Sequence, residues 1–148
     1  MSRIGRIAAS LAVAGMVAVL PATGRAAVAY NGMTVLPDPE HAGVFEVLRY
    51  PMAGPIDYWC AAGDFVVNRM HKPQNTRIYI ANGRAPSRLV RGRSAVTFTI
   101  VPYGDIAGLA GQDFGYSLSI SKRGYNFLAG GGRGLCVQSR RRLMHWGF

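Results

Sequence analysis

The clearest strand signals lie in the second half of the chain. Residues 96–100 alternate Val, Phe and Ile with threonine, and residues 116–121 alternate Tyr, Leu and Ile with serine. A period of two places alternate side chains on opposite faces of a strand, so both segments are predicted as half-buried strands. Shorter strands are expected at residues 44–50, 77–80, 125–128 and 135–139.

A helical period is found between Asp57 and His71. Apolar residues recur at helical spacing on one side, and polar residues fall within an arc of about 60° on the other. The apolar set is Trp59, Ala62, Val66 and Met70, and the polar set is Asp57, Asp64, Asn68 and His71. Asp57 is the expected N-cap, and the helix should end at Lys72 because proline disfavours the α conformation in the residue before it. A buried strand is the alternative for this segment.

Together these elements predict an α+β fold: one helix packed on a mostly antiparallel sheet of about five short strands, with one face of the sheet wet. Residues 30–43 and the glycine-rich residues 129–134 are expected to be irregular. There is no internal repeat and no linker that would separate a second domain.

The start of the chain has the pattern of an export signal. Two arginines precede an uncharged apolar run at residues 7–20, and a proline and small residues follow it. The run has 14 residues, whereas a membrane-spanning helix needs about 20. We expect residues 1–29 to be a cleaved signal peptide and residues 30–148 to form one periplasmic or secreted domain. Cleavage after Ala26 in place of Ala29 is also compatible with the small residues there.

The chain has two cysteines, Cys60 and Cys136, and both fall in the expected exported part. Thiols pair in an oxidising compartment, so a disulfide between them is predicted. It would close a loop of 76 residues, which in the chain-entropy model stabilises the fold by about 4–5 kcal/mol. A reactive thiol is the alternative, but no neighbouring residue in the sequence would lower the pKa of Cys60.

Three segments, Tyr58–Phe65, Arg77–Ile80 and Ala85–Ser87, resemble an uncharacterised family of small exported proteins from Gram-negative bacteria. The resemblance covers about residues 57–101. It implies export and carries no activity, cofactor or site residue with it.

The charge of the chain limits its partners. It has 17 basic and 7 acidic residues, and the part after residue 29 keeps 14 basic and 7 acidic residues, a net charge of +7. This charge suits an anionic partner, but no nucleic-acid reader motif accompanies it. An exported protein meets lipopolysaccharide, other envelope polyanions and acidic proteins, which are therefore the expected partners.

Residues 82–94 are expected to form a 13-residue loop between two strands, with four arginines. Loops of this length usually bind a partner or are mobile, and the planar fork of arginine suits phosphate and carboxylate. With three arginines near the C-terminus they form a candidate anion-binding site: Arg84, Arg88, Arg91, Arg93, Arg140, Arg141 and Arg142. A solvated loop without a ligand is the alternative.

No catalytic, cofactor or metal motif stands out. Ser119 and Lys122 match S-x-x-K but would face opposite sides of a strand, and the histidines lack metal-ligand spacing. We therefore expect a non-enzymatic binding domain without a cofactor. The alternative is a small hydrolase acting on cell-wall or extracellular substrate, which would need one of its histidines beside a serine or carboxylate. The histidines are His41, His71 and His145.

Overall fold

The chain folds into one six-stranded antiparallel sheet with helices packed against it. A computed structural model describes residues 24–112 and 114–146, so most of the expected signal peptide lies outside the described residues. The strands follow the order β1-β2-β3-β5-β4-β6. They are β1 (Ala27–Val28), β2 (Thr34–Pro37), β3 (Val44–Leu48), β4 (Arg77–Pro86), β5 (Ser94–Thr99) and β6 (Asn126–Leu128). The α+β class, the antiparallel sheet and the disulfide are confirmed.

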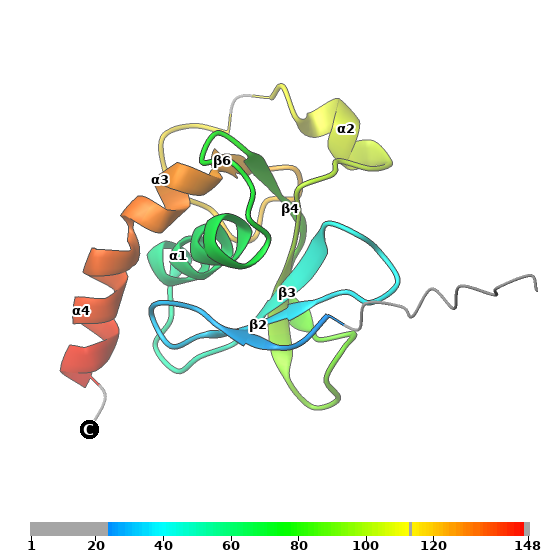
Figure 1. The fold of residues 1–148 in the computed structure, drawn as a ribbon. Helices are drawn as coiled ribbons and strands as arrows, with labels where there is room; N and C mark the ends of the chain where they lie inside the picture. The colour runs from blue at the N-terminus through cyan, green and yellow to red at the C-terminus, as the bar shows by residue number, and fades with distance from the viewer. Residues whose placement is uncertain (1–23, 113, 147–148) are drawn as a thin grey trace, which may run out of the picture.

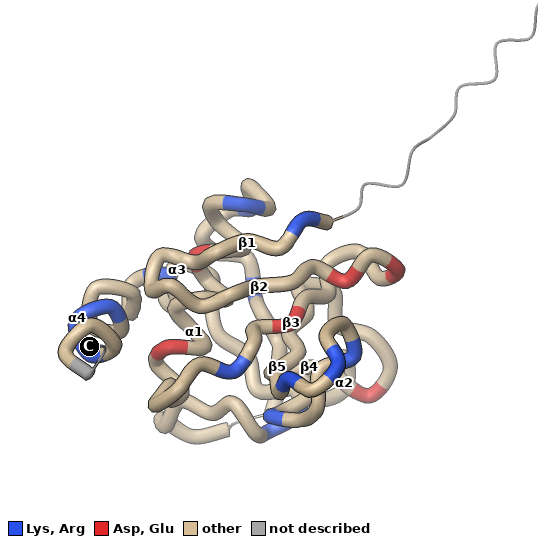
Figure 2. The backbone as a smooth tube through the Cα atoms, turned by 90° about the horizontal axis from the view of Figure 1, so that it is seen from below, with Lys and Arg blue, Asp and Glu red and all other residues tan. Residues whose placement is uncertain are grey.

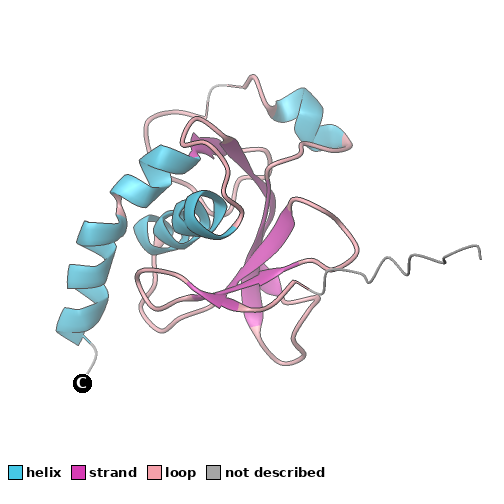
Figure 3. Ribbon diagram, viewed as in Figure 1, coloured by secondary structure: helices cyan, strands magenta, loops and turns pink. Residues whose placement is uncertain are grey.

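The described residues contain four α-helices in place of the single helix expected. These are α1 (Pro55–Asp64), α2 (Asp105–Leu109), α3 (Ala129–Gly134) and α4 (Cys136–Trp146), and a π-helical turn, η1 (Phe65–Arg69), continues α1. Helix α1 lies against the sheet, with α3 and α4 beside it, while α2 stands apart from them (Figures 1 and 3). None of the helices in the described residues has the length and hydropathy needed to cross a membrane.

Trp59 of α1 lies at the centre of the core. Its ring meets Phe98 of β5 edge to face at 5.1 Å and Phe127 of β6 at 5.8 Å between ring centroids. Its indole nitrogen donates to the Ser119 carbonyl at 2.8 Å. Large aromatic side chains bury much apolar area, and such edge contacts add to it, so Trp59 joins the helix to the half of the sheet formed by β5, β4 and β6.

The predicted helix is confirmed, but its N-cap is wrong. Helix α1 begins two residues earlier, with Gly54 as N-cap and Pro55 in the first turn, where the missing N–H of proline costs nothing. Asp57 is the third helical residue, and its side chain accepts from the Gly54 amide at 2.7 Å. The polar set of this segment is divided: Asp57 and Asp64 are buried and bonded inside the molecule, whereas Asn68 and His71 are exposed.

The glycine-rich loop and the last strand expected at residues 129–139 are both wrong, because this region is helical. Glycine-rich α3 packs closely on α1. Cys136, Ser139 and Leu143 are all buried and recur at helical spacing along α4, so one side of that helix faces the core. The Cys60–Cys136 disulfide, with Cα atoms 4.8 Å apart, therefore joins α1 to α4.

The strand expected at residues 116–121 is also wrong. Ser119 uses its hydroxyl to accept from the amides of Ser121 and Lys122, and such local bonds compete with a strand ladder. The sheet differs in two further respects. Residues 34–37 of the expected irregular lead-in form β2, and Thr97 and Thr99 are buried, so the second face of the sheet is not fully wet.

Candidate anion-binding surface

The segment expected as a 13-residue arginine-rich loop is mostly a β-hairpin. Strand β4 extends to Pro86 and β5 begins at Ser94, with these two residues paired and two register shifts earlier in β4. The connection is therefore residues 87–93. Arg84 lies within β4 and Arg88, Arg91 and Arg93 lie in the connection, so the backbone positions of these arginines are set by the sheet.

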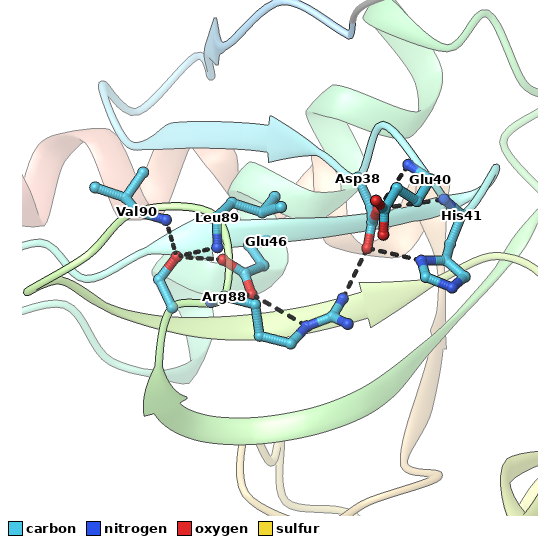
Figure 4. A network of polar contacts seen from close by, with 8 residues as sticks. Asp38, Glu40, His41, Glu46, Arg88, Leu89 and Val90 are labelled. Atoms are coloured by element: carbon cyan, nitrogen blue, oxygen red, sulfur yellow. Dashed lines mark hydrogen bonds and ion pairs between the residues drawn. The ribbon is translucent and has the colours of Figure 1, made fainter.

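Buried Glu46 of β3 fixes the start of this connection. Its carboxylate accepts from the Ser87 hydroxyl and, at 3.0 Å, from the Arg88 amide. The Ser87 oxygen in turn accepts from the amides of Leu89 and Val90 at 3.1 and 2.9 Å. Figure 4 shows this network beneath the hairpin. The first two residues of the connection, Ser87 and Arg88, are consequently bonded to the sheet through Glu46, and the next two, Leu89 and Val90, are bonded to Ser87.

The guanidinium of Arg88 is engaged by two carboxylates. Its Nη2 lies 2.7 Å from Asp38 Oδ2 and its Nε lies 3.8 Å from Glu46 Oε1. Burial disfavours the charged form of Asp38, but hydrogen bonds from the Glu40 amide and from His41 outweigh it, so the pKa of Asp38 lies below 3.8. Among the seven arginines of the candidate site, Arg88 is thus paired with carboxylates of the molecule itself, although its side chain is exposed.

Three arginines from distant parts of the chain converge on the turn between β3 and α1. Arg93 donates to the Arg49 carbonyl at 3.3 Å, Arg84 to the Ala53 carbonyl at 3.4 Å and Arg142 to the Met52 carbonyl at 3.4 Å. We call the residues brought together here the turn surface; they are Arg49, Tyr50, Met52, Arg84, Arg93 and Arg142. It joins the hairpin to α4, which Figures 1 and 2 show on different sides of the molecule.

The charges of the turn surface are only partly compensated. Arg142 pairs with Asp57, which is fully buried. Within the described residues Arg49, Arg84 and Arg93 have no acidic partner, and Arg84 lies over the Tyr58 ring at 5.6 Å. Three positive charges are therefore available to an anion at this surface.

Exposed apolar side chains lie among these charges. Met52 is 70% exposed and Tyr50 is 40% exposed. Met52 has a φ of 63°, a conformation that non-glycine residues adopt rarely. Tyr50 also lines a neighbouring open hollow between the start of the sheet and α4, together with Tyr30 and Met144. Arg140 lies over the Tyr30 ring at 5.0 Å, at the edge of that hollow.

The structure thus distributes the seven predicted arginines over three situations. Arg84, Arg93 and Arg142 meet at the turn surface, with Arg140 in the adjacent hollow; Arg88 is exposed but paired with Asp38 and Glu46. Arg91 and Arg141 are exposed and have no bonded partner among the described residues. Sequence reasoning missed Arg49, Tyr50 and Met52, whose signal is a basic and two large apolar residues on either side of Pro51, at the start of the turn that ends at Pro55.

The histidines form no metal site in the described residues, which hold no group of three potential ligands. His71 and His145 are exposed. The His41 Nδ1 lies 3.2 Å from Asp38 Oδ2, and His41 borders an open hollow that Arg88 and Tyr103 also line. One histidine therefore meets a carboxylate, as the hydrolase alternative requires.

Comparison with known proteins adds no identity to this geometry. No protein-family model, no curated protein and no solved structure matches the chain. The resemblance to a family of exported proteins, and the export that it implies, therefore stay predictions.

Proposed function

We propose that this chain is an exported, non-enzymatic domain that binds the anionic lipid surface of the cell envelope through the turn surface. The observation that carries the proposal is the exposed Met52 in a turn whose carbonyls Arg84 and Arg93 reach. These two arginines and Arg49 have no acidic partner in the described residues. An exposed apolar side chain beside several cations matches an interface in which phosphate groups overlie acyl chains.

The arginines and the apolar side chains of the turn surface would contact different parts of the lipid. Guanidinium groups form bidentate hydrogen bonds with phosphate, and each basic residue near an anionic membrane contributes about 1 kcal/mol. Met52 and Tyr50 would enter the headgroup region, where apolar contact adds to the electrostatic attraction. An acidic protein would use the same arginines but has no need of a protruding methionine.

The test is co-sedimentation of residues 27–148 with phosphatidylglycerol-containing vesicles and with pure phosphatidylcholine vesicles. We expect binding to the former only, weakening as salt rises. Replacing Arg49, Arg84 and Arg93 with glutamine should remove about 3 kcal/mol, which is roughly 100-fold in affinity. Met52→Ser should weaken binding while leaving the net charge unchanged.

The matched control replaces Arg69, Arg77 and Arg133 with glutamine, which removes the same charge from exposed positions. Arg77 lies seven residues from Arg84 along β4, about 23 Å away. An equal loss of vesicle affinity in both triple variants would mean that only net charge matters and would overturn the proposal that the turn surface is the binding site. Binding to an acidic protein but not to vesicles would favour the protein partner instead.

The hydrolase alternative is supported by one observation, the contact between His41 and Asp38 beside an open hollow. A hydrolase would lose its activity on cell-wall fragments when His41 is replaced with glutamine. No turnover by the wild-type chain, or turnover unchanged in His41→Gln, would dismiss this use of His41.

A further inference from the structure

The first described strand belongs to the sheet although it lies within the expected signal peptide. Ala27 and Val28 form β1 and pair antiparallel with Val35 and Thr34 of β2. Ala27 is half-buried and packs against the hydrophobic core. Strand β1 is thus an edge strand of the folded domain.

Ala29 is more deeply integrated than β1. It is 6% exposed and belongs to the core. Its amide donates to the Met33 carbonyl at 2.9 Å, and its own carbonyl accepts from Gly32 at 2.9 Å. These bonds form the tight connection from β1 to β2, so removing Ala29 would take away a core side chain and both of these hydrogen bonds.

The three residues before β1 are in a different environment. Gly24, Arg25 and Ala26 are all exposed and lie outside the sheet. Gly24 and Ala26 are the small residues that a signal peptidase needs at the third and first positions before its cut. A cut here would leave every strand of the described sheet intact.

We propose that the signal peptide is removed between Ala26 and Ala27, so that the mature chain begins with β1. Water hydrolyses this peptide bond, leaving a carboxyl group on Ala26 and an amino group on Ala27. The inference rests on the expected export of the chain and is independent of the proposed lipid binding.

The rival site after Ala29 has one point in its favour. The Tyr30 nitrogen donates to Asp64 Oδ2 at 3.0 Å, and a cut there would turn this amide into a charged amino group beside a buried carboxylate. The same cut would discard β1 and Ala29, with two strand pairs and a core side chain. Asp64 also accepts from Asn68, so its carboxylate is already bonded without the new charge.

The test is the intact mass and N-terminal sequence of the protein recovered from the periplasm or medium after expression of residues 1–148. We expect a chain beginning at Ala27. A chain beginning at Tyr30, or the uncut chain, would overturn the proposal. Ala26→Gln should raise the ratio of uncut to cut chain, and Ala29→Gln should leave it unchanged. Reading this ratio on denatured samples keeps the result valid even where Ala29→Gln prevents folding.

A second measurement compares purified chains that begin at Ala27 and at Tyr30. The shorter chain should unfold several degrees lower because it lacks β1 and the buried Ala29. Equal melting temperatures would contradict the argument from the sheet.

Discussion

Gly63 of α1 and Gly132 of α3 meet through their backbones, so neither position has room for a side chain. A β-carbon on Gly63 would lie 2.8 Å from the Gly132 carbonyl carbon, and one on Gly132 would lie 2.5 Å from the Trp59 carbonyl oxygen. This contact lets a glycine-rich segment form a helix, because the close approach of the two helices offsets the low helix propensity of glycine. It also brings Cys136 to Cys60.

Gly63→Ala should destabilise the fold strongly, because backbone atoms that surround the new methyl group cannot move aside easily. Overpacking of this kind costs about 1–3 kcal/mol, so a melting temperature lower by about 10 °C is expected. Gly134→Ala is the matched control, since that position in α3 has open space around it. It should be neutral or stabilising; equal effects of the two changes would dismiss the close-packing argument.

Replacing Cys60 and Cys136 together with alanine should lower the free energy of unfolding by about 4 kcal/mol, because the disulfide closes a loop of 76 residues. Urea unfolding in the presence and absence of reductant measures the effect. Reductant should shift the midpoint of the wild type and leave the double variant unchanged. A wild-type midpoint insensitive to reductant under unfolding conditions would argue against the bridge.

Arg142→Gln should be much more harmful than Arg141→Gln on the same helix. Asp57 is fully buried and pairs with Arg142, so loss of that cation leaves an uncompensated buried carboxylate. Because Arg142 itself is partly exposed, we expect a cost of about 2 kcal/mol after screening. The exposed Arg141 should change the unfolding free energy by less than about 0.5 kcal/mol. Chemical unfolding of both variants provides the comparison.

Ser87→Ala should loosen the hairpin connection. The change leaves a buried oxygen of Glu46 and the amides of Leu89 and Val90 without their partner, at a cost of about 1–3 kcal/mol. Hydrogen exchange of the residue 88–90 amides should accelerate. Ser117→Ala, at an exposed serine, is the control and should leave exchange in the hairpin unaltered; protection that survives Ser87→Ala would refute the network's role.

Asp38→Asn should destabilise the chain at neutral pH and become harmless in acid. The pKa of Asp38 is lower in the folded state than its ordinary value of 3.8, so its ionised form stabilises the fold above the unfolded pKa. That stabilisation is lost as the pH falls through the folded pKa. Urea midpoints of wild type and variant should therefore differ at about pH 7 and converge as the pH falls through the folded pKa of Asp38, which lies below 3.8. A pH-independent difference would assign the effect to packing instead.

Local patterns identified the elements whose side chains follow a simple period. Residues 44–48, 94–99 and 126–128 form strands near their predicted positions, and the helix from Asp57 is present. The pairing of the cysteines followed from their number and the expected compartment. For the candidate site, the sequence pointed to arginines of the hairpin and α4, but not to the turn that connects them.

The failures have three different causes. Residues 129–134 were predicted as a loop because glycine has a low helix propensity, but their packing on α1 makes them helical. Residues 135–139 were predicted as a strand from a short apolar run. The helical spacing of Cys136, Ser139 and Leu143 was overlooked. Residues 116–121 alternate apolar side chains with serine, as a half-buried strand does. In the fold, however, the Ser119 hydroxyl accepts from the Ser121 amide, and the Ser119 carbonyl accepts from the Trp59 indole.

Residue types and short-range spacing were enough to predict the α+β class, the helix at the centre of the fold, the disulfide and the excess of arginine. Which arginines remain free depends instead on contacts that form only when the chain folds. Arg88 and Arg142 are bound by carboxylates distant in the sequence, while Arg49, Arg84 and Arg93 lie at the turn surface and have no such partner in the described part of the chain. Charge is a property of each residue, but its availability depends on which neighbours the fold supplies.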